Sequence, residues 1–311
     1  MYTNQTVRYF IIRGFSDDPE MQIWIFFLVL IIYLITLGGN LTIFLLICVD
    51  RNLHTPMYCF LANLSVVDIS SSTISLHKIL TSFITHDKTI SYLSCMLQTY
   101  LFGSLIGHEL LILTAMSYDR YVAVCNPLRY HLVMNIRTCA ILMSACWLVG
   151  FLQVAPIDGI LYSFSCYSSI DVNHFFCDIV ALMKTSCNDT SFLEFLFFIE
   201  GITVLSVTPF VLTFIPYIFI IIAILKIRSN RGRYKAFYTC SSHLTVVILL
   251  YTTLVSQYMT PNLSSTLDSK KYFALFNTAA VPMLNPLIYS LKNKDVKKAL
   301  KRNLSKFKLI S

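Results

Sequence analysis

Long apolar runs are the feature that most restricts the fold of this chain. Residues 21–49 are almost continuously apolar, which exceeds the roughly 20 residues that a helix needs to cross a bilayer. Six further runs follow after polar connections, at about 56–80, 92–125, 138–161, 192–227, 236–259 and 272–291. The bilayer interior offers the backbone no hydrogen-bond partner, so such runs must fold as helices. The sequence predicts an all-α integral membrane protein, a seven-transmembrane-helix bundle.

Composition and charge favour the membrane over nucleic acid as the partner of this chain. Hydrophobic residues make up 56% of the chain and charged residues 13%, against about one quarter charged in soluble proteins. The net charge of +8 could suggest nucleic acid, but 17 of the 24 lysines and arginines fall on one side of the predicted bundle. That asymmetry follows the positive-inside rule and predicts a cytoplasmic carboxyl terminus. We therefore expect no nucleic-acid binding.

An odd number of spans predicts that the two ends of the chain lie on opposite sides of the membrane. Residues 1–21 are then an extracellular tail, and Asn4 begins an Asn-Gln-Thr triplet that fits N-glycosylation. No cleavable signal pattern precedes the first run, so the first helix is expected to act as an uncleaved signal. Residues 22–291 form the transmembrane domain, and residues 292–311 form the cytoplasmic tail.

Basic residues crowd this tail, while Val296, Leu300, Leu304 and Phe307 recur at helical spacing. The pattern predicts a short amphipathic cytoplasmic helix that lies on the anionic membrane lipids of the inner leaflet. A solvated, frayed tail is the alternative.

An adjacent acid and base, Asp119 and Arg120, stand where the third apolar run gives way to a basic loop. Charges at the rim of a bilayer are costly unless they are paired or solvated. The pair is therefore expected to hold its helix, or a neighbouring one, in one of two arrangements, which makes it a candidate activation switch. The alternative is an arginine that extends its charge to the membrane surface beside an incidental acid.

Four polar residues are predicted to cluster in the inner half of the bundle. At about 1.5 Å per helical residue, Asp68 lies roughly 18 Å above the start of the second helix and Glu109 roughly 16 Å above Arg120. Asn40 and Asn285 lie roughly 15 and 10 Å from the same membrane face. Two carboxylates at this depth cannot both stay charged and unpaired, so either one takes a proton or a cation binds between them.

The seventh run contains Asn285 and Pro286, followed by Tyr289. Proline lacks the backbone N–H and so frees a carbonyl in the preceding turn. Asn285 is expected to bond that carbonyl, which would give a bend that can act as a hinge. Tyr289 is expected to point inward toward Arg120.

Four cysteines, Cys95, Cys166, Cys177 and Cys187, fall on the predicted extracellular side, where disulfides form. Four cysteines allow three pairings, and their spacing does not choose among them. The connection between residues 162 and 191 is unusually long, which suggests a lid over the bundle.

Three stretches together identify a family resemblance. Residues 116–130 read MSYDRYVAVCNPLRY, residues 53–58 read LHTPMY, and residues 235–244 read KAFYTCSSHL. They resemble the odorant-receptor branch of the rhodopsin-like G-protein-coupled receptors. Two departures are Tyr238, where these receptors usually carry serine, and Pro216, which precedes Tyr217 where serine is usual. Pro216 could kink the fifth helix near its inner end.

The resemblance implies a multi-pass plasma-membrane receptor for olfaction and sensory transduction. It implies the disulfides Cys95–Cys177 and Cys166–Cys187, and sodium between Asp68 and Glu109, with a shared proton as the alternative. The partners it implies are a small-molecule odorant and a heterotrimeric G protein of the stimulatory olfactory type, with cyclic AMP as the signal. The residues it assigns to the switch and to G-protein coupling are Asp119, Arg120, Tyr121, Tyr217, His243, Asn285, Pro286 and Tyr289.

The outer half of the bundle is the expected ligand pocket, because ligand sites commonly lie between the helices of a bundle. Candidate lining residues are Gly103, Ile106, Gly107, Gly201, Ile202, Leu205, Tyr251, Leu254, Tyr258, Leu275 and Thr278. They are mostly apolar with a few hydroxyls and suit a small hydrophobic molecule. These positions lack the acidic residue that would pair with an amine ligand. Glu200 either faces this pocket or bonds another helix.

Signalling through a population shift needs no covalent chemistry, so we expect no enzyme activity. A secondary transporter would show internal repeats in corresponding halves, and none is visible. A rhodopsin-like receptor for a non-odorant ligand is the closest alternative.

Overall fold

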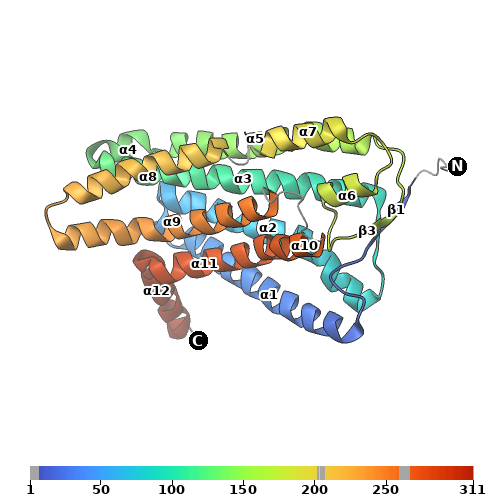
Figure 1. Cartoon of the computed structure of the whole chain (residues 1–311). Helices are drawn as coiled ribbons and strands as arrows, with labels where there is room; N and C mark the ends of the chain where they lie inside the picture. The colour runs from blue at the N-terminus through green and yellow to red at the C-terminus, as the bar shows by residue number, and fades with distance from the viewer. Residues whose placement is uncertain (1–6, 202, 204–206, 259–266, 311) are drawn as a thin grey trace.

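The computed structural model describes residues 7–201, 203, 207–258 and 267–310. Most of this part of the chain is helical, and the long helices lie side by side (Figure 1). The helices are α1 (Pro19–Val49), α2 (Pro56–Thr85), α3 (Tyr92–Cys125), α4 (Tyr130–Val133), α5 (Ile136–Tyr162), α6 (Ile179–Thr185), α7 (Ser191–Glu200), α8 (Thr208–Lys226), α9 (Asn230–Tyr258), α10 (Leu267–Leu275), α11 (Val281–Lys292) and α12 (Lys294–Ile310). Short 3₁₀ turns, η1 (Arg51–Leu53) and η2 (Pro127–Arg129), and a π-helix, η4 (Phe276–Ala280), complete them.

The described helices follow the seven predicted apolar runs. Within the described residues, α1, α2, α3, α5 and α8 are each long and apolar enough to cross a bilayer, and α9 adds a sixth if its bent halves count as one span. The fifth predicted run corresponds to α7 and α8, and the seventh to α10, η4 and α11 in direct succession. The third helix has the predicted bounds, whereas α9 begins at Asn230 rather than near Ala236 and so extends into the basic loop.

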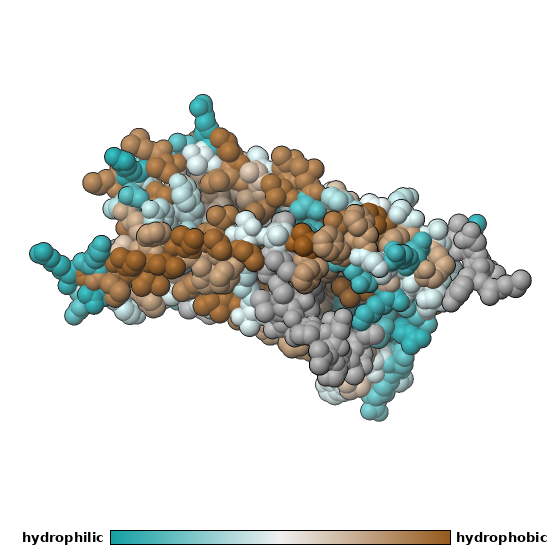
Figure 2. Space-filling model, turned by 45° about the horizontal axis from the view of Figure 1, so that its top comes forward, coloured by the Kyte–Doolittle hydropathy of each residue, from teal (hydrophilic) through white to brown (hydrophobic). Residues whose placement is uncertain are grey.

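The central helix of the bundle is α3, which packs against α2, α5, α8 and α9. By contrast, α1 lies at the periphery and exposes apolar side chains such as Trp24 and Leu34. Apolar side chains cover much of the visible flank, and hydrophilic side chains gather toward the ends (Figure 2). Exposed apolar flanks with polar ends are what a bilayer-spanning protein requires.

A small sheet covers one end of the bundle, near the N-terminus (Figure 1). Its central strand, β1 (Tyr9–Ile12), pairs antiparallel with β2 (Thr89–Ser91) and parallel with β3 (Asp171–Val172). Phe10 and Ile12 point into the core, as the alternation of a half-buried strand requires. Residues 1–21 were predicted only as a tail, and the order of residues 9–12 comes from these distant partners.

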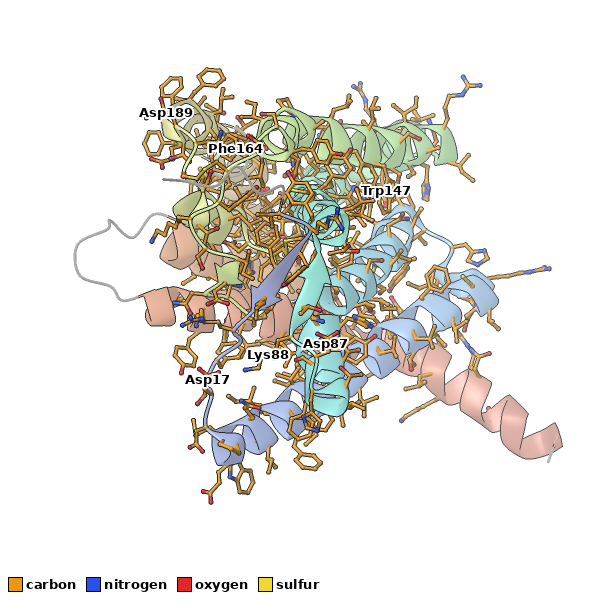
Figure 3. The ribbon with its side chains drawn as sticks, turned by 90° about the vertical axis from the view of Figure 1, so that its right-hand side faces the viewer. Asp17, Asp87, Lys88, Trp147, Phe164 and Asp189 are labelled. Carbon is orange, nitrogen blue, oxygen red and sulfur yellow. A yellow bond between two sulfur atoms is a disulfide. The ribbon has the colours of Figure 1, made fainter. Side chains whose placement is uncertain are left out.

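Ion pairs fasten the segment that follows β1 to the same end of the molecule. Arg13 Nη2 lies 2.7 Å from Asp171 Oδ2. Lys88 Nζ lies 3.0 Å from Asp17 Oδ1, and Figure 3 labels both residues at this end of the molecule. These ion pairs hold the pKa of Asp17 below its ordinary value, chiefly through the hydrogen bond from Lys88. Asp18 then caps α1 by accepting a hydrogen bond from the backbone N–H of Glu20 at 3.2 Å.

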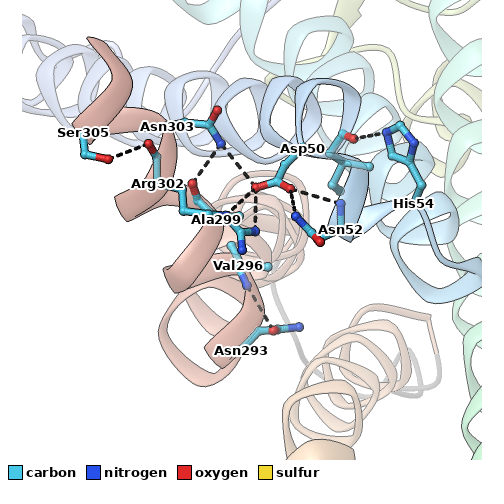
Figure 4. Close-up of polar contacts among 10 residues, drawn as sticks. Asp50, Asn52, His54, Asn293, Val296, Ala299, Arg302, Asn303 and Ser305 are labelled. Carbon is cyan, nitrogen blue, oxygen red and sulfur yellow. Dashed lines mark hydrogen bonds and ion pairs between the residues drawn. The ribbon is translucent and has the colours of Figure 1, made fainter. Parts of the chain in front are cut away.

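At the opposite end, α12 is a helix as its amphipathic pattern predicted, rather than a frayed tail (Figure 4). Val296 and Ala299 are buried against the bundle. Arg302 donates to Asp50 Oδ2 from Nη2 at 2.7 Å and from Nε at 3.3 Å, which ties α12 to the loop that follows α1.

Candidate functional site

The acid of the predicted switch pair is buried near the C-terminal end of α3. Asp119 accepts a hydrogen bond of 2.8 Å from the hydroxyl of Tyr130, the first residue of α4. Arg120 Nε lies 3.9 Å from Asp119 Oδ2, which is a longer contact. Burial raises the pKa of Tyr130, and the nearby Asp119 raises it further, so the hydroxyl keeps its proton and can donate. The pair forms as predicted, and Tyr130 is a further partner.

A second contact joins α8 to α9 near the same end. The hydroxyl of Tyr217 lies 2.5 Å from Nδ1 of His243, and the two rings stack with centroids 5.7 Å apart. Both side chains are buried, and Tyr121 of α3 packs against the cluster around them. Pro216 lies inside α8, which continues through it, so Tyr217 reaches α9 despite this departure from the family pattern.

The predicted polar cluster assembles in the interior of the bundle. Asn285 donates from Nδ2 to both carboxylate oxygens of Asp68, each at 3.1 Å. Glu109 is buried nearby, and its Oε1 has no hydrogen-bond partner in the described part of the chain. Carboxylate oxygens suit hard cations, so these two acids would supply oxygen ligands to a sodium ion, whose binding stays a prediction.

The carbonyl freed by Pro286 is bonded by a different residue from the one predicted. Asn40 of α1 donates from Nδ2 to the carbonyl oxygen of Pro282 at 3.0 Å, whereas the amide of Asn285 donates to the carboxylate of Asp68. The prediction that Asn285 bonds this carbonyl is therefore wrong. A Cβ at Gly39 would lie 2.9 Å from Cγ of Pro286, so this glycine lets α1 approach α11 closely enough for the bond.

Tyr289 is buried on α11, close enough to Arg120 and Tyr217 to interact electrostatically with both. Its hydroxyl has no hydrogen-bond partner among the residues that the structure describes. The switch residues thus gather at one end of the bundle, on α3, α8, α9 and α11.

A hollow lies toward the opposite end, between α3, α5 and α7 and beside the segment that leads into α6. It measures about 570 Å³ when the space open to the surroundings is included. Two predicted ligand residues, Gly103 and Ile106, line it, together with Phe176 of the long connection. Glu200 also lines the hollow, which answers the question of where this acid faces.

The other glycines of the predicted pocket have different surroundings. A Cβ at Gly107 would overlap the amide of Gln153, so this glycine makes room for a side chain of α5. Gly201 is half-buried, and no neighbouring atom would meet its Cβ.

Tyr251 and Leu254 of α9 are buried in the same apolar core as Ile106, and Leu275 packs against that core. Thr278 is buried, and its carbonyl oxygen accepts a hydrogen bond from Ser72 Oγ at 3.3 Å. Whether these residues contact a ligand stays a prediction. The following lie outside the described residues: Asn4, Ile202, Leu205 and the side chain of Tyr258.

Both disulfides implied by the resemblance are present, Cys95–Cys177 and Cys166–Cys187. The first ties the long connection to the start of α3 and brings the buried Phe175 and Phe176 over the bundle. Burial lowers the pKa of the neighbouring His174, so this side chain is neutral at neutral pH.

Sequence reasoning missed Asp158 on α5. This carboxyl group is buried and accepts a hydrogen bond of 2.6 Å from Oγ1 of Thr99, a residue that lines the hollow. The signal was available, because a lone acid inside an apolar run is a functional candidate by default.

A membrane bundle with these connected clusters defines a receptor of the rhodopsin-like, G-protein-coupled class. The crystal structure of squid rhodopsin superimposes with a TM-score of 0.72, at 17% identity, covering 93% of this chain and 82% of that one, which supports the fold. The chain belongs to the olfactory receptor family, whose family model matches residues 29–307. Olfactory receptor 5AP2 of Mus musculus is 44% identical over 96% of this chain and 94% of its own length. Olfactory receptor 2A12 of Homo sapiens is 42% identical over 98% of this chain and 99% of its own. The protein is thus a multi-pass plasma-membrane signalling receptor and not an enzyme.

Proposed function

We propose that this receptor binds a small, mostly hydrophobic odorant in the outer half of its bundle and activates a stimulatory, olfactory-type G protein, which raises cyclic AMP. The observation that carries the proposal is the buried contact between Tyr217 and His243, which closes the inner ends of α8 and α9. In the proposed orientation the N-terminus is extracellular and the C-terminus cytoplasmic, supported by the excess of lysine and arginine at the inner end.

Activation is proposed to be a shift between two arrangements of the bundle. Moving α9 away from α8 breaks the contact between Tyr217 and His243 and opens a groove at the inner end. A ligand that fits the open arrangement better stabilises it by its differential affinity. Arg120, which is only distantly paired with Asp119, is then free to contact the G protein or Tyr217.

We further propose that Asp68 and Glu109 would hold a sodium ion in the closed arrangement. Such an ion supplies positive charge to two buried carboxyl groups that have no basic partner among the described ion pairs. Asn285 positions Asp68 from α11, so the site connects α2, α3 and α11.

The test is a cyclic AMP reporter assay of the full chain against a broad odorant panel. We expect at least one odorant to raise cyclic AMP, and Arg120→Ala to abolish the response to every odorant while surface expression is unchanged. Arg51→Ala, which removes an exposed arginine at the same end, is the matched control. Normal signalling by Arg120→Ala would remove Arg120 from the switch.

A further inference from the structure

The walls of the outer hollow carry acids and, among the described residues, no base. Glu200 of α7 and Asp178 line it, and none of the described lining residues is lysine, arginine or histidine. Asp178 already has a structural role, because its Oδ1 accepts a hydrogen bond from the backbone N–H of Ala181 at 3.1 Å and so caps α6. Glu200 therefore supplies the carboxyl group that is free to meet a ligand.

A second carboxyl group, that of Asp158, is hydrogen-bonded to a residue that lines the hollow. Asp158 is 8% exposed, and its Oδ1 accepts from Thr99, which itself lines the hollow. Its other oxygen, Oδ2, is buried and has no hydrogen-bond partner in the described part of the chain. Asp158 and Glu200 lie close enough for their charges to interact.

With both acids charged, this arrangement is unfavourable without a cation. A buried polar atom that has lost water and gained no partner is costly, and two carboxyl groups that interact add repulsion if both are charged. Neither acid takes part in an ion pair within the described chain. A neutral hydrophobic ligand would leave the buried oxygen unpaired, whereas an ammonium group supplies positive charge and three N–H donors.

We infer that Glu200 and Asp158 form the cation-recognising end of the ligand pocket, and that the receptor takes small apolar amines as ligands. The inference rests on the proposed odorant-binding function and names its ligand class. The apolar body of the amine packs against Phe102, Ile106 and Val154, which line the rest of the hollow. The pocket expected from the sequence had no assigned acid, because Asp158 was missed and Glu200 was left with two alternatives, the pocket or a bond to another helix.

The test measures binding directly, without the G protein. The full chain is purified into lipid nanodiscs, and its thermal unfolding midpoint is measured with hexylamine and cyclohexylamine and with hexanol and cyclohexanol. We expect the amines to raise the midpoint more than the alcohols of the same skeleton. Charge-assisted hydrogen bonds contribute enough that Glu200→Gln should weaken amine binding by about tenfold or more. Asp158→Asn should do so too, while it keeps the acceptor for Thr99.

The matched control is Glu194→Gln on the same helix. Glu194 accepts a hydrogen bond from Oγ1 of Thr190 at 2.7 Å and does not line the hollow, so amine binding should not change. Equal amine binding by the wild type and both acid variants would overturn the inference. A receptor that binds no amine but raises cyclic AMP in response to neutral odorants would also overturn the inference. That outcome would leave the proposed function intact. Amine binding that depends on Glu200, without any cyclic AMP response, would instead support the inference and remove the proposed function.

Discussion

Asn40 shows how a single side chain can stabilise the bend in α11. Its amide is the donor for the carbonyl oxygen that Pro286 leaves free, and both partners are buried. We expect Asn40→Ala to destabilise the protein by about 1–2 kcal/mol, because the carbonyl would be left without a partner in the membrane interior. Thermal unfolding in nanodiscs measures this. Thr42→Ala, which removes an exposed hydroxyl bonded within its own helix, should have little effect. Equal stability of both variants would mean that another group bonds the carbonyl.

The hydrogen bond of Asn40 illustrates which parts of the site the sequence could predict and which it could not. That Pro286 frees a carbonyl follows from covalent structure, and that Asp68, Glu109 and Asn285 lie in the same half of the bundle follows from helical rise. Which amide bonds which acceptor depends on packing between helices. Asn40 reaches the carbonyl because Gly39 allows close approach, and Gly107 faces Gln153 rather than open space. Helical arithmetic gives depth in the bundle but leaves rotation about the helix axis undetermined.

At the scale of elements, long apolar helices were predictable, and short segments held by distant partners were not. The bounds of α3 agree with the sequence because its apolar run ends in a polar, basic loop. By contrast, β1 is four residues long and is ordered by β2 and β3, which lie far along the chain. A short strand with one buried face carries too little local signal to be recognised without its neighbours.

The contact between α12 and the loop after α1 gives a prediction for an element. Arg302→Gln should loosen α12, because Arg302 donates two hydrogen bonds to Asp50, whereas Lys301→Gln makes the same charge change at an exposed site. Hydrogen exchange of the α12 amides should become several-fold faster in the first variant only. Equal exchange in the two variants would show that the other contacts of α12 hold the helix without Arg302, namely the buried Val296 and Ala299 and the hydrogen bond from Asn303 to Asp50.

The same contact should depend on pH. The hydrogen bonds from Arg302 and then Asn52 lower the pKa of Asp50 to about 2, below its ordinary value of 3.8. A depressed carboxyl pKa stabilises the folded state above the ordinary value, and that contribution is lost as the pH falls from about 4 toward 2. The difference in α12 exchange between the wild type and Arg302→Gln should therefore be full at neutral pH, shrink below about pH 4 and disappear only below about pH 2, where Asp50 is protonated in the folded state as well. A difference that stays at its full neutral-pH size at pH 2 would show that the contact does not depend on the charge of Asp50.

At the scale of the whole molecule, the proposed activation depends on the contact between Tyr217 and His243, which joins α8 to α9. If it holds the closed arrangement, Tyr217→Phe removes one hydrogen bond while keeping the stacked ring. A net hydrogen bond contributes about 0.5–1.5 kcal/mol, which corresponds to about a two- to tenfold shift toward the open arrangement. Basal cyclic AMP should rise, and the half-maximal concentration of an agonist should fall by a similar factor. Tyr234→Phe, an exposed tyrosine of α9, should change neither. A fall in agonist response instead would mean that the hydroxyl of Tyr217 is needed in the open arrangement, where Arg120 is the partner proposed for it.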